Sequence, residues 1–190
     1  MAGATALAGC GGDSQDANEK AGTYRVEVVR TSFPRRQALA DSPQLAITVR
    51  NVGDQAVPNI AVTVGNDEGD TFSSPSSQPG NADPLRPVWV INSGPVGGTS
   101  AYVDTWTLGR LAPQRTKTFR WELTSIKPGN HKLVYRVGGG LDGKARAELP
   151  GGGPVEGAIS VNVSPKPAQA CLTDTDEVIR QQADDTGSCQ

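Results

Sequence analysis

Residues 45–64, LAITVRNVGDQAVPNIAVTV, decide the fold class of this 190-residue chain. Apolar and polar side chains alternate over Leu45–Arg50, which is the period-two pattern of a half-buried strand. Asn51–Asp54 supplies residues that tolerate turn conformations, and a second apolar alternation follows over Ile60–Val64. The stretch therefore predicts two strands folded back on each other through a short polar turn, with apolar faces that a second sheet must cover.

Further alternating segments lie on both sides of this stretch. Turn-forming clusters separate them at roughly the 8–12-residue spacing of a β-sandwich. The segments are 24–30, 88–91, 102–108, 116–123, 133–137, 144–149 and 159–163. Nothing within residues 23–164 has a helical period. We therefore expect one all-β domain at 23–164, an Ig-like antiparallel β-sandwich of about eight strands between flexible N- and C-terminal tails.

Composition agrees with a turn-rich β fold and limits the classes of partner. Gly 23 and Pro 14 together make up about a fifth of the chain, which is high for helices. The formal net charge is −2, and apart from Arg35-Arg36 the basic residues are scattered singly, so we expect no nucleic-acid partner. No run approaches the ~20 apolar residues of a membrane-spanning helix. Membrane contact is expected only through a lipid.

The N-terminal residues Leu7-Ala8-Gly9-Cys10 resemble the lipobox of bacterial lipoprotein signal peptides. In that family the Cys receives a diacylglyceryl group and begins the mature protein. The resemblance implies lipidation at Cys10 and an extracytoplasmic, lipid-anchored location. The signal looks truncated, because the apolar run is short and no Lys or Arg precedes it. We assign residues 1–22 to this signal and a polar tether; the alternative is a disordered terminus with an incidental Cys.

Three turn-centred motifs resemble the Ig-like modules of bacterial surface proteins. These modules include the cell-adhesion-related domain found in bacteria and the conserved repeat domain of envelope proteins. The motifs are Leu45–Val64, Leu108–Pro113 followed by Thr116–Trp121, and Lys127–Gly129 before Leu133–Arg136. The resemblance implies a sandwich and a surface location more than an activity. Two positions depart from it: Gln114 replaces a usual Gly, and His131 replaces a usual aromatic residue.

Catalytic chemistry has little support in the residue types. His131 is the only histidine, so any Ser-His-Asp or Cys-His arrangement would have to use it. It follows a Pro-Gly-Asn turn, where we expect an exposed imidazole. The three cysteines and this histidine do not form a usual zinc set. We therefore predict no catalytic residue, no metal and no cofactor.

Two other groups of residues have a functional and a structural interpretation. Asn66–Asp70 offers oxygen ligands to Ca²⁺ but lacks EF-hand spacing, so a solvated acidic turn is the simpler hypothesis. Trp89, Trp106 and Trp121 would suit a sugar-stacking platform, but their positions within strands favour the core. The long loop Gly65–Pro87 is the expected contact surface.

Residues 165–190 form the C-terminal tail. Cys171 and Cys189 enclose an acidic segment, and a disulfide between them would suit an oxidising compartment. The alternative is a frayed tail with two free thiols. Asp174–Gln182 is compatible with a short helix, because it has a capping residue and acids in its first turn.

The sequence therefore favours a non-catalytic cell-envelope lipoprotein whose Ig-like domain mediates interaction with an envelope protein or glycan. A second hypothesis is a structural spacer or accessory subunit that pairs through a sheet edge. A third is an enzyme whose site has no recognisable pattern.

Overall fold

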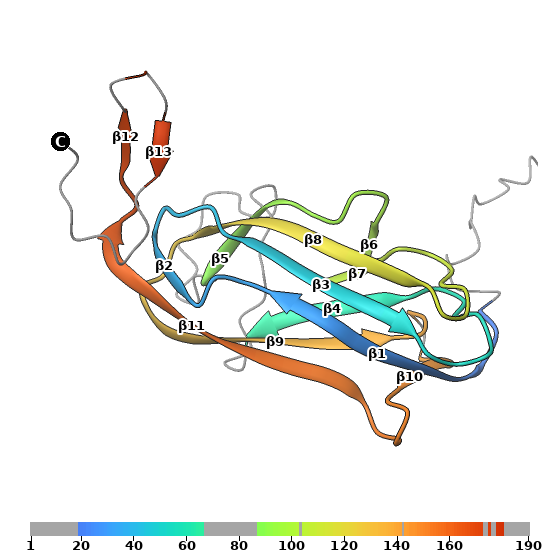
Figure 1. Cartoon of the computed structure of the whole chain (residues 1–190). Coiled ribbons are helices and arrows are strands. Elements are labelled where there is room, and N and C mark those ends of the chain that lie inside the picture. Colours follow the sequence, from blue (N-terminus) through green and yellow to red (C-terminus); the bar gives the residue numbers. More distant parts are fainter. Residues whose placement is uncertain are drawn as a thin grey trace, which may run out of the picture.

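A computed structural model describes residues 19–66, 87–102, 104–141, 143–172, 175 and 178–180. These residues form strands and no helix, and the strands build two packed sheets (Figure 1). The first sheet has the order β10 (Ala145–Glu148), β1 (Gly22–Ser32), β3 (Gln44–Asn51), β8 (Thr116–Ser125) and β5 (Trp89–Ser93). The second has the order β2 (Arg36–Leu39), β11 (Val155–Pro167), β9 (Gly129–Gly138), β4 (Ala61–Asn66), β7 (Thr105–Thr107) and β6 (Thr99–Tyr102).

The all-β sandwich expected from the alternation is confirmed. Its two sheets hold five and six strands, which is more than the eight or so expected. The additional strands include β2 and β6, each of four residues, which are too short to show a periodic pattern. Most pairs are antiparallel, but β10 pairs in parallel with β1, and β2 pairs in parallel with β11.

The two strands of the deciding stretch do not pair with each other. β3 pairs with β1 and β8, whereas β4 pairs with β7 and β9 in the opposite sheet. The connecting segment crosses the sandwich and has its own support, because Val57 exchanges backbone hydrogen bonds of 2.9 and 3.0 Å with Leu111. The predicted hairpin is therefore wrong. Alternation indicates which side chains are buried, but it does not determine which strand is the neighbour.

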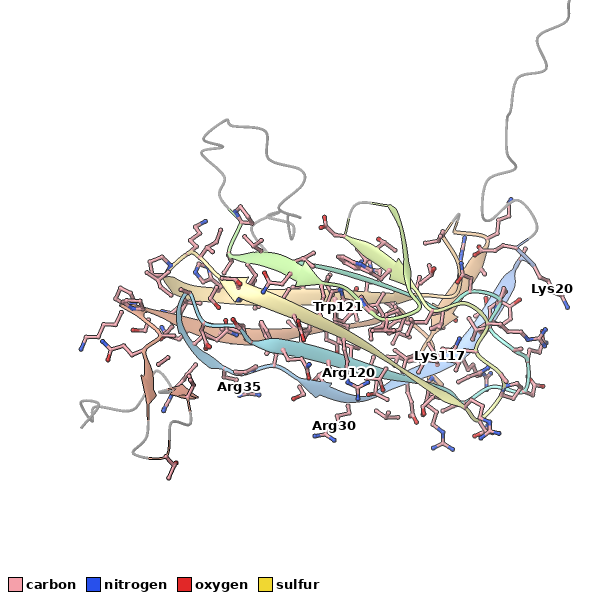
Figure 2. The ribbon with its side chains drawn as sticks, turned by 90° about the horizontal axis from the view of Figure 1, so that it is seen from above. Lys20, Arg30, Arg35, Lys117, Arg120 and Trp121 are labelled. Carbon is pink, nitrogen blue, oxygen red and sulfur yellow. The ribbon has the colours of Figure 1, made fainter. Side chains whose placement is uncertain are left out.

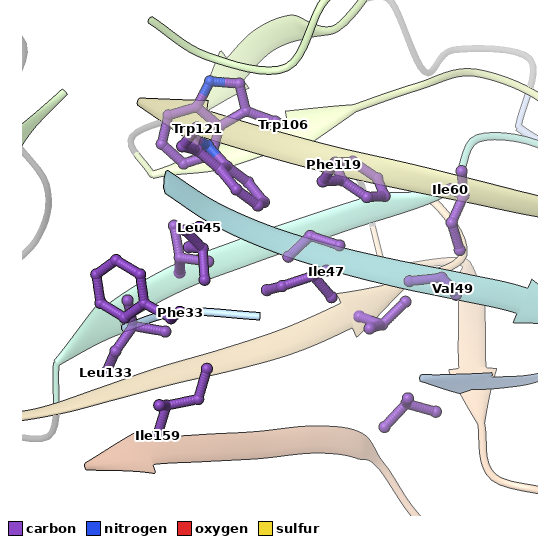
Figure 3. Close-up of a cluster of buried hydrophobic side chains, with 14 of the residues drawn as sticks. Phe33, Leu45, Ile47, Val49, Ile60, Trp106, Phe119, Trp121, Leu133 and Ile159 are labelled. Carbon is purple, nitrogen blue, oxygen red and sulfur yellow. The ribbon is translucent and has the colours of Figure 1, made fainter. Parts of the chain in front are cut away.

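The inward rows predicted from the sequence form a single core (Figure 3). Six of its side chains on β3 and β8 are 0 % exposed: Leu45, Ile47, Val49, Phe119, Trp121 and Leu123. Trp89, Trp106 and Trp121 are all buried. The Trp121 ring stacks on Phe119 with centroids 5.9 Å apart and meets Trp106 edge-on at 5.5 Å. The indoles therefore belong to the core and do not form a sugar-stacking platform.

Gln114 lies in the turn between β7 and β8, where the resemblance expects a Gly. Gln114 has φ 59°, the left-handed conformation that favours Gly, which is the residue expected there from the resemblance. Its amide donates to the Asn51 carbonyl at 2.9 Å.

In the tail, β12 (Ala170–Leu172) pairs with β13 (Val178–Arg180) as a separate hairpin. Helix over Asp174–Gln182 is therefore wrong at 178–180, because strand pairing satisfies these backbone groups.

Several predicted features lie outside the described residues. They are Cys10 with the rest of residues 1–18, loop residues 67–86 with most of the acidic turn Asn66–Asp70, and Cys189. Cys171 lies on β12 opposite Ile179, but only its backbone is described. Lipidation, calcium binding and the disulfide therefore stay predictions. In the described part of the chain, no helix has the length and apolar character needed to cross a membrane.

Candidate functional site

The outer face of the six-stranded sheet presents a row of cross-strand pairs along β9 and β11. Inward neighbours such as Leu133 and Val161 are buried, so the alternate side chains must point outward. The antiparallel register brings these outward residues together in pairs. The pairs are Asn130–Asn162, Lys132–Ser160, Val134–Ala158 and Arg136–Glu156, and we call them the β9–β11 outer row.

One end of the outer row borders a hollow of about 860 Å³, the apolar hollow. Val134 lies at its centre, opposite Ala158 on one side and Gly65 of β4 on the other. Because both neighbours are small, the surface dips between larger side chains. Arg136 and Glu156 form an exposed ion pair of 3.1 Å at the rim. Such a pair contributes little to stability, so both charges can engage a ligand. The hollow is lined by Thr63, Val64, Gly65, Asp104, Val134, Tyr135, Arg136, Glu156, Gly157 and Ala158.

The other end of the outer row borders the basic hollow, of about 610 Å³. It has three cationic side chains and no carboxylate among its lining residues, which are Arg35, Arg36, Asn130, His131, Lys132, Ser160, Val161 and Asn162. A concave surface with one sign of charge attracts counter-ions more strongly than a flat one. The chain as a whole has a net charge of −2, so this positive charge is a local feature.

Backbone pairing and side-chain contacts fix the basic hollow. The Asn162 amide N–H donates to the Arg35 carbonyl at 2.8 Å, and Arg36 faces Asn162 in the parallel β2–β11 register. The Asn162 side-chain Nδ2 donates to Asn130 Oδ1 at 2.7 Å. Arg36 and Lys132 each make a further interaction within the chain, and Arg35 is exposed at the surface (Figure 2). The hollow therefore combines two side-chain amides, which hydrogen-bond to each other, with guanidinium and ammonium groups.

His131 is not the exposed imidazole expected from the turn before it. It belongs to the inward row of β9 and is half-buried, because strand β9 already begins at Gly129. Its ring meets Trp89 edge-on with centroids 6.1 Å apart, and its Nε2 lies 3.1 Å from the Lys127 carbonyl oxygen. These contacts are structural. Within the described residues, no group of three or more His, Cys, Asp and Glu could hold a metal ion.

A buried polar group missed by the sequence analysis joins the two sheets. Gln37 of β2 is 0 % exposed. Its Oε1 accepts hydrogen bonds from Trp89 Nε1 and Ser125 Oγ, both at 2.7 Å, and its Nε2 donates to the Pro34 carbonyl at 2.9 Å. Buried polar atoms that are satisfied in this way stabilise a fold and are not available to a substrate.

Two titratable side chains extend from the inward rows towards the edge of the core. The Tyr135 ring lies over Gly157, its opposite residue on β11, and burial raises the pKa of its hydroxyl above the ordinary value. The Lys117 ammonium donates to the Leu108 carbonyl oxygen, and burial lowers the pKa of this amine. Figure 2 shows Lys117 and Trp121 on the same strand, β8. Neither shift involves a neighbouring charge, so neither indicates an acid–base pair.

The outer face of the five-stranded sheet is a useful contrast. Arg30 and Arg120 are exposed on it and flank Ala46, Thr48 and Thr118 (Figure 2). Thr48 and Thr118 share a hydrogen bond of 2.9 Å. Both sheets therefore carry exposed arginines, and beside β1 and β10 the five-stranded sheet also has a hollow of about 450 Å³, which Lys144 and Arg146 line. The β9–β11 outer row differs in joining a basic hollow to an apolar one.

Comparisons with solved structures return matches of low sequence identity. Neither a protein-family model nor a curated protein matches the sequence. The CARDB domain of the PF1109 protein from Pyrococcus furiosus, solved in complex with di-metal ions, is 15 % identical, with TM-score 0.45 over 75 % of this chain and 93 % of that one. A native Escherichia coli alpha-2-macroglobulin fragment is 16 % identical, with TM-score 0.46 over 78 % and 18 %. A Listeria innocua beta-glucosidase is 18 % identical, with TM-score 0.38 over 76 % and 16 %.

The similarity is too distant to assign function. The chain has the architecture of an Ig-like β-sandwich on the grounds of its own sheets and core. Neither an activity nor a metal follows from the comparisons for this protein.

Sequence analysis identified only part of the candidate site. It singled out Arg35-Arg36 as the one adjacent basic pair. It could not bring Lys132, Asn130 and Asn162 to the same place, because that requires the register of β9 against β11. The available signal was the polar alternation over 130–132 and 160–162. Residues 67–86 of the loop expected to make the contact lie outside the described residues.

Proposed function

We propose that this protein is a non-catalytic binding module of the cell envelope, lipid-anchored through Cys10, whose Ig-like domain engages an envelope protein or glycan. The observation that supports this function most is the hollowed β9–β11 outer row. It joins an apolar hollow to a basic one on a rigid sheet, and recessed surfaces with a few polar groups are where ligands bind. The buried polar groups of Gln37, Trp89 and Ser125, by contrast, are engaged in holding the sheets together.

Co-sedimentation with envelope fractions tests the binding. The full chain carrying Cys10→Ser, which blocks lipidation, is mixed with wall fragments and with membrane vesicles from the producing cells. Saturable binding to one fraction is expected. Non-saturable binding, or binding to neither fraction, would contradict the proposal.

Two matched substitutions of alanine by tyrosine, one on each sheet, localise the binding surface. Ala158 lies in the apolar hollow, and Ala46 lies on the outer face of the opposite sheet. Ala158→Tyr fills the hollow and should weaken envelope binding roughly tenfold or more, because one bulky side chain excludes the ligand. Ala46→Tyr should leave it unchanged. Equal losses in both variants would exclude the hollow as the binding surface.

The lipid anchor has a separate test. The intact mass of protein extracted from the producing cells with detergent should correspond to a chain that begins at Cys10 and carries diacylglyceryl. Reduction of a Cys171–Cys189 disulfide should add about 2 Da. A water-soluble chain that retains residues 1–9 would remove the anchor from the proposal.

The alternative of pairing through a sheet edge has less support. The edge strands are β10 and β5 in one sheet and β2 and β6 in the other, and none is longer than five residues. β5 is also interrupted by a register shift between Ile91 and Ser93. Short or bulged edges are a common protection against edge-to-edge pairing.

A further inference from the structure

We propose that the β9–β11 outer row binds an anionic oligosaccharide, with an acidic group of the sugar in the basic hollow and the adjoining sugar residues over the apolar hollow. This rests on the proposed function and deepens it by naming the ligand class. The two hollows adjoin, because the Lys132–Ser160 pair of the basic hollow is the outward pair next to Val134–Ala158. From Asn130 to Arg136 the row spans about 20 Å at strand rise, which suits a chain of sugars better than a single one.

The basic hollow has the chemistry to recognise an oxyanion. Arg35 and Arg36 offer planar guanidinium forks that bind carboxylate or phosphate through two parallel hydrogen bonds, and Lys132 adds a point charge. No carboxylate lines the hollow, so an incoming anion meets no repulsive charge within it. The contribution of each cation is expected to be moderate, since Arg36 and Lys132 also interact within the chain.

The neutral groups of the row favour a sugar over other anionic partners. Asn130, Asn162 and Ser160 supply amide and hydroxyl groups that can pair with sugar hydroxyls. Val134 and Ala158 form a low apolar floor for the C–H face of a sugar ring. A protein partner would favour an aromatic anchor at the centre, and a bilayer would favour Trp, Phe or Leu at the surface. The outer row itself contains none of these residues, and the aromatic side chain that lines the apolar hollow, Tyr135, belongs to the inward row and lies over Gly157.

Calorimetric titration of the full chain carrying Cys10→Ser tests the ligand class. The probes are a hexamer of galacturonic acid, a phosphorylated maltohexaose and, as the neutral control, maltohexaose. Binding of either anionic probe, but not of maltohexaose, is expected, and the tighter of the two identifies carboxylate or phosphate as the preferred group. Binding should weaken as sodium chloride rises from about 50 to about 500 mM. Equal binding of maltohexaose would overturn the proposal.

Two charge-matched double variants assign the binding to this surface. Arg35→Gln with Lys132→Gln removes two exposed cations from the basic hollow, and affinity should fall roughly tenfold or more. Arg30→Gln with Arg120→Gln removes two exposed cations from the opposite sheet and should leave affinity unchanged. An equal loss of affinity in both double variants would show that the overall charge of the protein attracts the probe, and it would exclude the basic hollow as the binding site. Arg35→Lys keeps the charge but loses the fork, so an intermediate loss is expected.

Further measurements distinguish a failure of this inference from a failure of the proposed function. Vesicles containing phosphatidylglycerol should not bind the Cys10→Ser chain; if they bind it more tightly than the anionic oligosaccharides, the ligand is a membrane and the inference fails. If wall fragments bind and the sugar probes do not, with the Arg35→Gln, Lys132→Gln variant unaffected, the inference fails and the proposed function survives. If nothing binds, both fail.

Discussion

At the scale of single residues, Asn51 determines where the chain leaves the first sheet. It is the last residue of β3 and is 0 % exposed. Its Nδ2 donates to the carbonyls of Gln55 at 2.8 Å and Leu111 at 3.0 Å, and its Oδ1 accepts from the Gly53 amide at 2.9 Å. One side chain therefore holds the start of the crossover against the β7–β8 connection.

Asn51→Ala should destabilise the protein by about 2–4 kcal/mol, because it removes the three hydrogen bonds that the buried Asn51 side chain makes at the start of the crossover. The free energy of unfolding measured with urea provides the test. Asn92→Ala is the matched control: its amide makes an exposed hydrogen bond to Thr124, so a change below about 1 kcal/mol is expected. Equal effects of the two substitutions would contradict the role given to Asn51.

Tyr135 should make stability depend on pH in alkaline solution. Burial raises the pKa of its hydroxyl above the ordinary value of 10.0, so the folded chain holds this proton more tightly than the unfolded chain. Its contribution is fully present below pH 10 and is lost as pH rises through the folded pKa. Wild-type protein should therefore lose more unfolding free energy between about pH 9 and about pH 11 than Tyr135→Phe, in urea titrations at each pH. Parallel curves would refute this assignment.

At the scale of elements, β9 and β11 are joined by a Tyr–Gly cross-strand pair. A Cβ added at Gly157 would overlap the Tyr135 ring, so the ring occupies the space that a side chain would take. Gly157→Ala should cost about 1–3 kcal/mol by overpacking. The same substitution made in Tyr135→Val should cost much less, because the ring is absent. Additive effects in this double-mutant cycle would show that the two residues do not interact.

The same scale explains which elements the sequence could and could not predict. The inward rows of β3, β8, β9 and β11 followed from alternation, because burial on one face imposes a period of two. The pairing of β3 with β4 was wrong, since a crossover and a hairpin give the same alternation on either side of a turn. Gln37 was missed because Trp89 and Ser125, which donate to its Oε1, lie far from it in the sequence.

The candidate site was only partly predictable for a related reason. Arg35 and Arg36 are adjacent in sequence and were seen, whereas Lys132 and Asn162 reach them only through the antiparallel β9–β11 register and the parallel β2–β11 register. The imidazole of His131 was wrongly expected to be exposed, because His131 was treated as part of the turn that precedes it. Local chemistry predicted the turn, but the strand that begins at Gly129 decides where the imidazole lies.

At the scale of the whole molecule, one core joins both sheets, and all three tryptophans lie in it. A domain with a single core should unfold in one cooperative step. Tryptophan fluorescence, which reports on the core, and far-UV circular dichroism, which reports on the strands, should therefore give coincident urea transitions. Separate midpoints would show that the two sheets unfold independently.

The distribution of function over the molecule follows from the same architecture. Large apolar side chains are directed inward, where they hold the two sheets together, and the polar rows face outward on both sides. Hollows with cationic side chains also lie beside Lys144 and Arg146 and beside Lys20 and Arg110, but the β9–β11 outer row joins a basic hollow to an apolar one. We therefore expect this surface to be the one that meets a partner.

Nuclear magnetic resonance of side-chain amides tests this claim most directly. The Asn130 and Asn162 amides lie in the basic hollow, and the exposed Asn92 amide lies on the opposite sheet. When solubilised envelope glycan is added to the ¹⁵N-labelled Cys10→Ser chain, the NH₂ signals of Asn130 and Asn162 should shift with a saturable dependence on concentration, and those of Asn92 should stay in place. Shifts confined to Asn92, or no shifts in any of the three, would contradict the account.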